Sequence, residues 1–290
     1  MKILNYGSIN VDHVYSVDHI SRAGETLAAR SYQVFAGGKG ANQSAALALA
    51  GAVVYHAGRV GPEGAWVVDK LAGLGVDVRH VAVHDEPTGH ASIQVDPHGQ
   101  NSIVIFAGAN EHQDMDTVRS VLGHFQPGDI LLLQNEINGI YDLINEGSQS
   151  GLRVVYNPAP AAPWVPDLPL HLVDTIILNQ TEATALTGVD DVPRQLEQMA
   201  SSWPNLDCVL TLGTAGMAYR GRAGAFALPA VSVAATDTTG AGDTFIGYYL
   251  AAIAGGMAPA DAAARAVRAA ALCVCRPGAM DSIPAAAEVS

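Results

Sequence analysis

The segment Asp237–Phe245, Asp-Thr-Thr-Gly-Ala-Gly-Asp-Thr-Phe, has the residue types best suited to chemistry in this chain. Gly240, Ala241 and Gly242 carry little or no side chain, so a ligand can approach their backbone amides, and an apolar stretch expected to be helical follows them. Free N–H groups and the helix dipole at a helix N-terminus attract anions. A carboxylate beside such an anion, Asp243, is better explained as a group that accepts a proton. The alternative is an ordinary glycine turn with Asp243 as the helix N-cap.

A second glycine cluster, Gly37–Gln43, opens a helix expected to continue through Leu49. It is not a Walker A loop, because Gly40 follows Lys39 where Ser or Thr is required and Gln33 stands in place of the first glycine. Neither glycine cluster satisfies the dinucleotide-binding fingerprint. Because the chain has only three lysines, one of them among three glycines before a helix indicates a bound polar ligand. A flexible surface turn is the alternative interpretation.

Polar residues follow several expected strands at the point where each strand ends. They are Asn10, Asp12, Glu136, Asn157, Asn179, Glu182 and the segment Thr211–Gly216. In open α/β sheets ligands bind along the carboxyl edge of the strands, so these residues predict one site there. Each of them alone is more often a cap or a turn former.

Short apolar runs alternate with alanine-rich helical stretches over most of the chain. The expected strands include Lys2–Tyr6, Val53–Ala57, Ile130–Leu133, Arg153–Tyr156, Thr175–Leu178 and Cys208–Thr211, with a strand-like segment at Ala230–Ala234. This alternation predicts an α/β fold with a mostly parallel central sheet and helices on both faces. The nearly continuous apolar character of the runs from Ile130 onward is typical of strands buried on both faces.

Two segments interrupt this alternation, residues 13–35 and 88–106. Both have the β-prone alternation and turn residues of hairpins. We expect them to form one small antiparallel sheet, a lid, on a main domain made of residues 1–12, 36–87 and 107–290. Two unrelated surface hairpins are the alternative.

Composition limits the classes of function. The chain has 290 residues, 15 basic against 28 acidic residues and a net charge of −13, so it is not expected to bind nucleic acid. With 49% hydrophobic residues it is not intrinsically disordered. Neither a signal peptide nor an apolar stretch of the ~20 residues that span a bilayer is visible, so a cytoplasmic location without a membrane partner is expected. The three cysteines form no disulfide framework, and the ten histidines form no convincing metal site.

Together these segments resemble the PfkB carbohydrate kinase family, also called the ribokinase family. Gly37–Gln43 resembles the N-terminal signature of the family, and Asp237–Phe245 resembles the C-terminal signature. Further matches occur in the family's order at Asn10-x-Asp12, Gly24-Glu25-Thr26, Gly108-Ala109-Asn110, Asn157-Pro158-Ala159-Pro160, Asn179-x-x-Glu182 and Thr211-Leu212-Gly213. The resemblance extends from Gly7 to Ser282.

The resemblance implies ATP-dependent phosphorylation of a sugar hydroxyl on a three-layer ribokinase-like fold with a small β-sheet lid. It makes Asp243 the catalytic base and the amides of Gly240, Ala241 and Gly242 the anion hole. It assigns sugar binding to Asn10, Asp12, Gly38, Lys39, Asn42 and Glu136, together with Asp243. It assigns nucleotide binding to Asn179, Thr211, Gly213, Gly216 and Gly242.

The resemblance also implies two metal ions and a dimer. Mg²⁺ accompanies ATP and would be held through water by Asn179 and Glu182. K⁺, as an activator, would bind a site built from Asp237, Thr239, Cys273, Arg276, Gly278 and Ser282. In these kinases the lid pairs with the lid of a second subunit, so a homodimer is expected.

The acceptor that the polar residues suit best is a small polyhydroxylated ring, and D-ribose, converted to ribose 5-phosphate, is the first hypothesis. The alternatives within the family are fructose, deoxyribose or a nucleoside such as adenosine. A nucleoside base would need an apolar surface, which the lid segments offer in Tyr15, Tyr32, Phe35 and Phe106. A catalytically silent regulator that binds a sugar or a nucleotide is the alternative from another class, and Asp243 argues against it.

Overall fold

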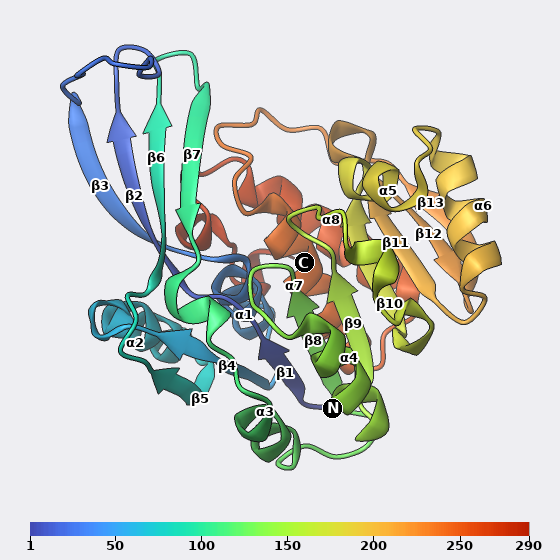
Figure 1. Ribbon diagram of the computed structural model, residues 1–290. Coiled ribbons are helices and arrows are strands. Elements are labelled where there is room, and N and C mark those ends of the chain that lie inside the picture. The colour runs from blue at the N-terminus through green and yellow to red at the C-terminus, as the bar shows by residue number, and fades with distance from the viewer. Residues whose placement is uncertain (290) are drawn as a thin grey trace.

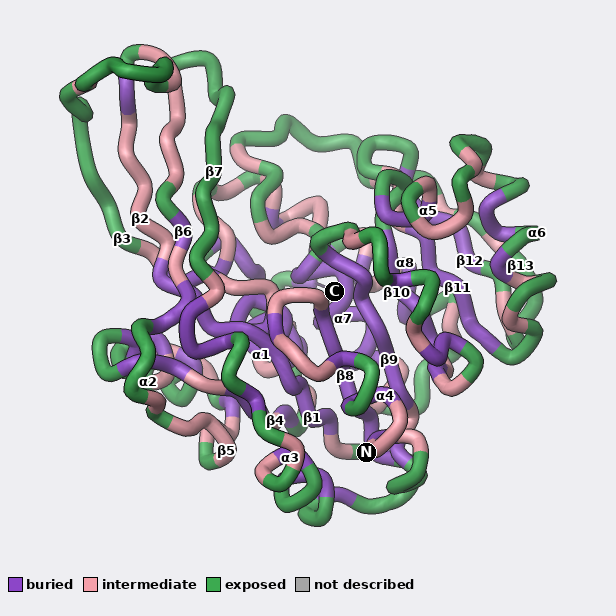
Figure 2. Tube along the Cα trace, viewed as in Figure 1, coloured by how far each residue is buried: buried purple, intermediate pink, exposed green. Residues whose placement is uncertain are grey.

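The chain forms one large and one small β-sheet, and the small sheet projects from the body of the molecule (Figure 1). The computed structural model describes residues 1–289. The interior strands of the large sheet are buried, whereas most of the small sheet is partly or fully exposed (Figure 2). No helix within residues 1–289 has the length and apolar character needed to span a membrane.

The large sheet has nine strands. In spatial order they are β13 (Gly224–Leu228), β12 (Met217–Gly221), β11 (Asp207–Thr211), β10 (Thr175–Asn179), β9 (Arg153–Asn157), β8 (Ile130–Gln134), β1 (Ile3–Tyr6), β4 (Val54–Val60) and β5 (Asp77–Val83). All neighbours pair in parallel except β12, which runs antiparallel to both β11 and β13. The expected mostly parallel sheet is confirmed.

Helices cover both faces of this sheet. They are α1 (Lys39–Leu49), α2 (Ala65–Gly73), α3 (Met115–Leu122), α4 (Ile140–Gln149), α5 (Gln180–Thr187), α6 (Val192–Ser202), α7 (Ala241–Ala254) and α8 (Pro259–Cys273). Successive side chains of a strand point to opposite faces, so Ile130 joins the core under α1, α2, α7 and α8, and Leu131 joins the core under α3, α4, α5 and α6. The result is the three-layer architecture that the strand–helix alternation predicts.

Helices α1 and α7 pack closely at Gly247, and both begin at the carboxyl edge of the sheet. A Cβ at Gly247 would lie 2.3 Å from the Cβ of Ala46 and 2.8 Å from the backbone N of Leu47. The glycine therefore allows the two helices to approach each other, which fixes the relative position of their N-termini.

Gly247→Ala is expected to lower the free energy of unfolding by about 1–3 kcal/mol, because the methyl group overpacks this contact. The matched control is Gly73→Ala in α2, where an added Cβ meets no atom within 4 Å. That change is expected to leave stability unchanged or raise it by up to about 1 kcal/mol, since alanine is the better helix former. Urea unfolding measures both, and a Gly247→Ala variant as stable as the unsubstituted protein would contradict the packing argument.

The small sheet has four strands, in the order β3 (Ser31–Gly37), β2 (Asn10–Ser16), β6 (Gly89–Val95) and β7 (Asn101–Phe106). The two hairpin pairings, β2 with β3 and β6 with β7, are antiparallel, but β2 and β6 pair in parallel. The expectation of an antiparallel sheet throughout is therefore wrong at its centre. The reason is that β2 and β6 each follow a strand of the parallel large sheet, β1 and β5, and so leave it in the same direction.

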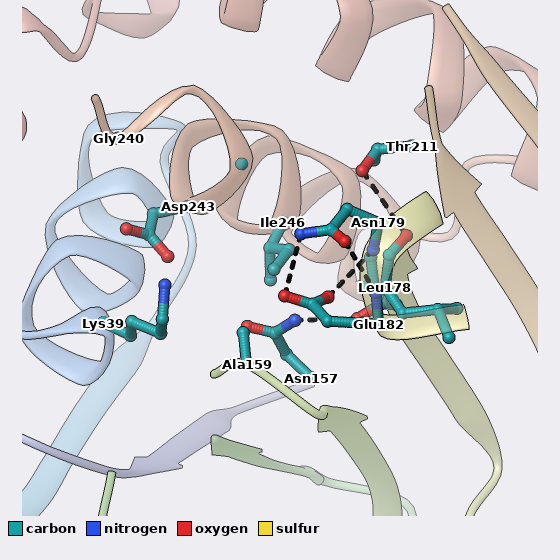
Figure 3. A pocket seen from close by; sticks show the side chains of 12 residues that line it. Lys39, Asn157, Ala159, Leu178, Asn179, Glu182, Thr211, Gly240, Asp243 and Ile246 are labelled. Atoms are coloured by element: carbon teal, nitrogen blue, oxygen red, sulfur yellow. Dashed lines mark hydrogen bonds between the residues drawn. The ribbon is translucent and has the colours of Figure 1, made fainter. Parts of the chain in front are cut away.

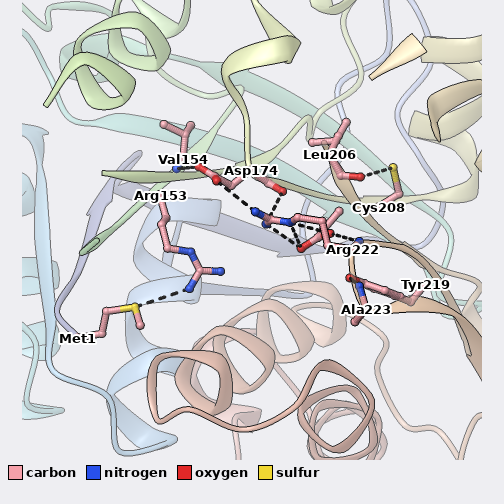
Figure 4. Close-up of polar contacts among 10 residues, drawn as sticks. Met1, Arg153, Val154, Asp174, Leu206, Cys208, Tyr219, Arg222 and Ala223 are labelled. Atoms are coloured by element: carbon pink, nitrogen blue, oxygen red, sulfur yellow. Dashed lines mark hydrogen bonds and ion pairs between the residues drawn. The ribbon is translucent and has the colours of Figure 1, made fainter. Parts of the chain in front are cut away.

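The β12–β13 hairpin, which the sequence did not predict, is held at the amino ends of the neighbouring strands (Figure 4). Nη2 of Arg222 lies 2.9 Å from Oδ2 of Asp207, and Nη1 lies 3.8 Å from Oδ1 of Asp174. The predicted strand at Ala230–Ala234 is wrong. This segment is irregular and mostly exposed, because its valines favour a strand but no strand of residues 1–289 pairs with it.

Candidate active site

A cavity of about 220 Å³ lies where the carboxyl ends of β9, β10 and β11 meet the N-termini of α1 and α7 (Figure 3). Its polar lining includes Lys39, Asn157, Asn179, Glu182, Thr211 and Asp243. The structure thus brings the two glycine clusters and most of the strand-end residues to one place, on the edge of the sheet where ligands bind in this class of fold.

The N-terminus of α7 presents backbone donors and one carboxylate to this cavity. Gly240 caps the helix with φ 76°, a conformation that favours glycine. The Ala241 amide makes only a 3.4 Å turn bond to the Thr238 carbonyl, and the amides of Gly240 and Gly242 have no acceptor within residues 1–289. An N-terminus of this kind attracts an anion. Because the N-cap is Gly240, the alternative that made Asp243 the N-cap is wrong.

Asp243 lies in the first turn of α7 and is 8% exposed. Its carboxylate accepts two hydrogen bonds from α1: Nδ2 of Asn42 donates to Oδ2 at 3.2 Å, and Nε2 of Gln43 donates to Oδ1 at 2.9 Å. Gln43 belongs to the N-terminal signature, but no role was expected for it. Its contact joins residues 200 positions apart, and no local pattern reveals it.

Lys39 is the only lysine or arginine among the described residues that line this cavity, and its side chain lies beside Asp243 (Figure 3). Burial alone would lower the pKa of Lys39. The carboxylates of Asp243, Glu136 and Glu182 outweigh burial, so the net shift of the pKa is upward. Lys39 therefore stays protonated and gives positive charge to the cavity of a chain whose net charge is −13.

Glu136 and Asn10 line a second cavity of about 470 Å³. Oε2 of Glu136 accepts from Oγ of Ser8 at 2.5 Å and from the backbone N of Lys39 at 2.9 Å. Asn10 is held in turn by Asn110, whose Nδ2 donates to its Oδ1 at 2.7 Å. Ser8 and Asn110 position these side chains, and the sequence analysis assigned them no role.

Asp12 lies over Gly37, where an added Cβ would be 2.1 Å from its Oδ2. Burial, and then the nearby charge of Glu136, raise the pKa of Asp12 to about 6. Gly38, the N-cap of α1, has φ 89° and so requires glycine for its backbone conformation. The structure therefore gathers the predicted sugar-binding residues at the start of α1 and the base of the small sheet.

Asn179 and Glu182 form a capping box at the start of α5 and line the cavity. Both oxygens of Glu182 accept from Asn179, Oε2 from its backbone N at 2.9 Å and Oε1 from Nδ2 at 2.8 Å. Burial raises the pKa of Glu182, and it outweighs the opposing effect of the Asn179 backbone N–H and of Lys39. Residues 1–289 contain no group of three His, Cys, Asp or Glu side chains placed to hold a metal ion. Mg²⁺ usually keeps several waters and binds one or two carboxylates plus substrate phosphates, and Glu182 fits that mode.

Three of the five residues predicted to bind the nucleotide belong to the segment Thr211–Gly216, and they differ in position. Thr211 lines the cavity at the end of β11. Gly213 is exposed on the following turn, with φ 57° and no atom within 4 Å of an added Cβ. Gly216 is buried, has φ 98°, and would place a Cβ 2.0 Å from the Leu228 carbonyl oxygen. The structure thus gives Gly216 a packing role against the end of β13 and keeps it out of the cavity lining.

All six predicted K⁺ residues are connected by hydrogen bonds, Arg276 through its backbone N, which donates to the Cys273 carbonyl oxygen at 3.1 Å. Oδ1 and Oδ2 of Asp237 accept at 2.9 Å from the backbone N of Thr239 and of Gly278 respectively. Although burial raises the pKa of Asp237, hydrogen bonding from the Thr239 side chain and from these two backbone N–H groups outweighs it and lowers the pKa. Sγ of Cys273 lies 3.0 Å from Oγ of Ser282 and 3.9 Å from the Thr239 carbonyl oxygen. The Arg276 guanidinium pairs instead with Glu288, so only the backbone of Arg276 is left to serve a cation.

Residues 1–286 match the family described as pfkB family carbohydrate kinase. The chain belongs to this family, and it is therefore an ATP-dependent sugar kinase, a phosphotransferase. It is 38% identical over 287 residues to the ribokinase of Haemophilus influenzae, covering 96% of this chain and 94% of the relative.

Solved structures agree with the sequence comparison. The ribokinase of Thermotoga maritima superposes with a TM-score of 0.90 at 32% identity, covering 99% of this chain and 97% of that one. Arabidopsis thaliana ribokinase, solved as a complex with ribose and ATP, superposes with a TM-score of 0.86 at 31% identity, covering 99% and 96%. The expected ribokinase-like fold is confirmed.

Proposed function

We propose that this protein phosphorylates D-ribose with ATP, giving D-ribose 5-phosphate and ADP. The observation that carries the proposal is the first turn of α7, where a buried carboxylate, Asp243, adjoins the backbone amides of Gly240 and Gly242, which have no acceptor within residues 1–289. The similarity to ribokinases, one of them solved with ribose and ATP, supports ribose as the acceptor.

In this proposal Asp243 accepts the proton of the acceptor hydroxyl as the new O–P bond forms and the bond to the ADP oxygen breaks. The amides of Gly240, Ala241 and Gly242 stabilise the negative charge on the transferred phosphoryl group, with no reorganisation during the reaction. Lys39 adds a fixed positive charge. Phosphoryl transfer needs little covalent chemistry from a protein, so this positioning and charge stabilisation supply most of the catalysis.

The acceptor is proposed to lie between Asp243 and Glu136, with its remaining hydroxyls on the predicted sugar-binding residues. These are Asn10, Asp12, Gly38, Lys39, Asn42 and Glu136. Ser8 fixes Glu136 and Asn110 fixes Asn10. The set offers donors and acceptors in a small volume, as a ring with several hydroxyls requires.

Nucleotide binding is proposed for the part of the cavity that Asn179, Thr211 and Gly242 line, and for Gly213 on the exposed turn beside it. Gly216 would act indirectly, through its packing against the end of β13. Asn179 and Glu182 would hold Mg²⁺ through water molecules. When bound with ATP, Mg²⁺ neutralises phosphate charge.

The small sheet is proposed to act as a lid and as the contact with a second subunit, with residues 13–35 and 88–106 as its limits. Four consecutive apolar side chains of β7 are exposed, Ile103 by 49%, Val104 by 69%, Ile105 by 57% and Phe106 by 47%. Exposed apolar strands are commonly covered by another chain. A cytoplasmic location is proposed because Cys208, Cys273 and Cys275 are all free thiols.

An assay over ribose, fructose, deoxyribose and adenosine tests the acceptor. The highest kcat/KM is expected for ribose. If ribose is not phosphorylated and another member of the panel is, that compound replaces ribose as the proposed acceptor. Absence of turnover with every member of a broader panel would favour the silent regulator.

The kcat/KM for ribose is expected to rise as the pH increases through about 6, because the pKa of Asp12 is raised to about 6 and its ionised form accepts hydrogen bonds from hydroxyl groups. Below that pH the carboxyl is protonated and loses acceptor capacity. Asp12→Asn is expected to remove this step from the pH profile while lowering kcat/KM at neutral pH. A step near pH 6 that persists in Asp12→Asn would assign it to another group.

Activity is expected to be higher in potassium than in sodium salts, because the segment before α7 and the segment after α8 are already held together around the Asp237 carboxylate. Kinase rates at equal ionic strength measure the effect, with Asp237→Asn as the variant that should lose the difference. Equal rates in both salts would remove K⁺ from the proposal.

A further inference from the structure

A chain of buried polar side chains leads from Asp243 into the interior of the large domain. Its members are Gln43, Gln134, Asn5, Ser44 and His56, and each is 0% exposed. None of them is among the residues that line the two cavities. Because burying polar groups is unfavourable unless they are hydrogen-bonded, a chain of five such residues calls for an explanation.

The orientation of the side-chain amides in this hydrogen-bonded row follows from one backbone carbonyl, that of Gly40. Nδ2 of Asn5 donates to the Gly40 carbonyl oxygen at 2.7 Å and to Oγ of Ser44 at 2.9 Å. A carbonyl oxygen can only accept, so the other atom of the Asn5 amide, Oδ1, must face Gln134. Nε2 of Gln134 donates to it at 2.9 Å.

The second N–H of Gln134 fixes the orientation of Gln43. Nε2 of Gln134 also donates to Oε1 of Gln43 at 2.7 Å, so the amide nitrogen of Gln43 must point the other way, toward α7. There it donates to Oδ1 of Asp243 at 2.9 Å and to Oδ1 of Asn157 at 3.0 Å. Asn157 is oriented independently, since its Nδ2 donates to the Ile177 carbonyl oxygen at 2.8 Å.

The inner end of this row of hydrogen-bonded side chains, at Ser44 and His56, adds no charge. Nδ1 of His56 lies 2.8 Å from Oγ of Ser44, and burial lowers the pKa of His56 to about 4, so the ring is neutral at neutral pH. The charged groups that face Asp243 from the other elements are Lys39 and Glu182. The network therefore orients a neutral donor at Asp243 and leaves the charge balance of the cavity to those two side chains.

We propose that Gln43 is a positioning residue for phosphoryl transfer, because its side-chain amide holds the Asp243 carboxylate in the orientation that faces the acceptor. The inference rests on the proposed role of Asp243 as the base. Reaction rates fall steeply when a reacting group is misplaced, so a donor fixed by two backbone carbonyls gives the base a defined position. Gln43 acts through Asp243 and does not itself touch the substrates.

The first test is Gln43→Met, which keeps the length and volume of the side chain and removes both its donor and its acceptor. We expect kcat to fall by roughly tenfold to thirtyfold and KM for ribose and for ATP to change by less than roughly threefold. The matched control is Gln195→Met in α6, a glutamine that is also 0% exposed and donates to the Val189 carbonyl oxygen at 2.7 Å. Gln195→Met should lower stability without changing kcat.

A double-mutant cycle separates positioning from a merely structural role. In the Asp243→Asn background, adding Gln43→Met should cause no further loss of the residual rate, because Gln43 no longer has a base to orient. A further loss equal to that in the unsubstituted enzyme would overturn the inference, as would a kcat for Gln43→Met within roughly twofold of the parent. Full activity in Asp243→Asn alone would instead overturn the proposed base.

Thermal unfolding shows whether Gln43→Met is folded at the assay temperature. If it is not, Gln134→Met provides the measurement, since it leaves Gln43 in place and removes the donor that orients it, together with the bond from Gln134 to Asn5. The expected result is a smaller fall in kcat, by roughly threefold to tenfold, again absent in the Asp243→Asn background. An unchanged kcat in a folded Gln134→Met variant would overturn the inference.

Discussion

Asp243→Asn is expected to lower kcat by roughly 10²–10⁴-fold, the range in which positioned acid–base groups contribute, with little change in the affinity for the sugar. The amide keeps the size of the carboxylate, but it cannot accept the hydroxyl proton at neutral pH. The variant should fold, because Gln43 can still donate to the remaining side-chain oxygen and the Asn42 amide can turn to accept from the new N–H group.

Steady-state kinetics with ribose and ATP measure the loss, and sugar binding by calorimetry measures the affinity separately. Asn42→Ala is an informative comparison, because Asn42 donates to the same carboxylate at 3.2 Å but leaves the base itself in place. Asn42→Ala should lower kcat much less than Asp243→Asn does. An Asp243→Asn enzyme with the kcat of the parent would show that another group, or water, takes the proton.

Gly242→Ala is expected to lower kcat by roughly 10²-fold, close to the effect of losing one donor from an anion hole. An added Cβ would meet no protein atom within 4 Å, and Gly242 lines the cavity. The methyl group therefore has room in the folded protein but occupies space that the phosphoryl group needs near the amides. Folding should be as stable as in the parent, or more stable by up to about 1 kcal/mol.

The combination of lost activity and retained stability distinguishes this prediction from a folding defect. Gly73→Ala is the control, since it is also a helical glycine with open space around its Cβ, and it lies outside the cavity. That variant should match Gly242→Ala in stability and the parent in kcat. Unchanged kinetics in Gly242→Ala would mean that the transferred phosphoryl group does not approach this turn.

The sequence by itself determined the class of fold, the two glycine clusters and the edge of the sheet at which they lie. These inferences succeeded because each depends on a local property: the apolar period of buried strands and helices, and the need for glycine at Gly38 and Gly240, where φ is positive. The prediction failed at Ala230–Ala234, where a local preference had no neighbouring strand to pair with.

Only the tertiary structure decided which side chains meet across long separations of the chain. The parallel pairing of β2 with β6, the packing of Gly216 against β13, and the bond from Gln43 to Asp243 each join segments distant in sequence. Such contacts are set by how helices and strands pack, and packing depends on the volumes and directions of many side chains at once. The sequence could therefore supply the carboxylate at position 243, and the folded chain was needed to show what holds it in place.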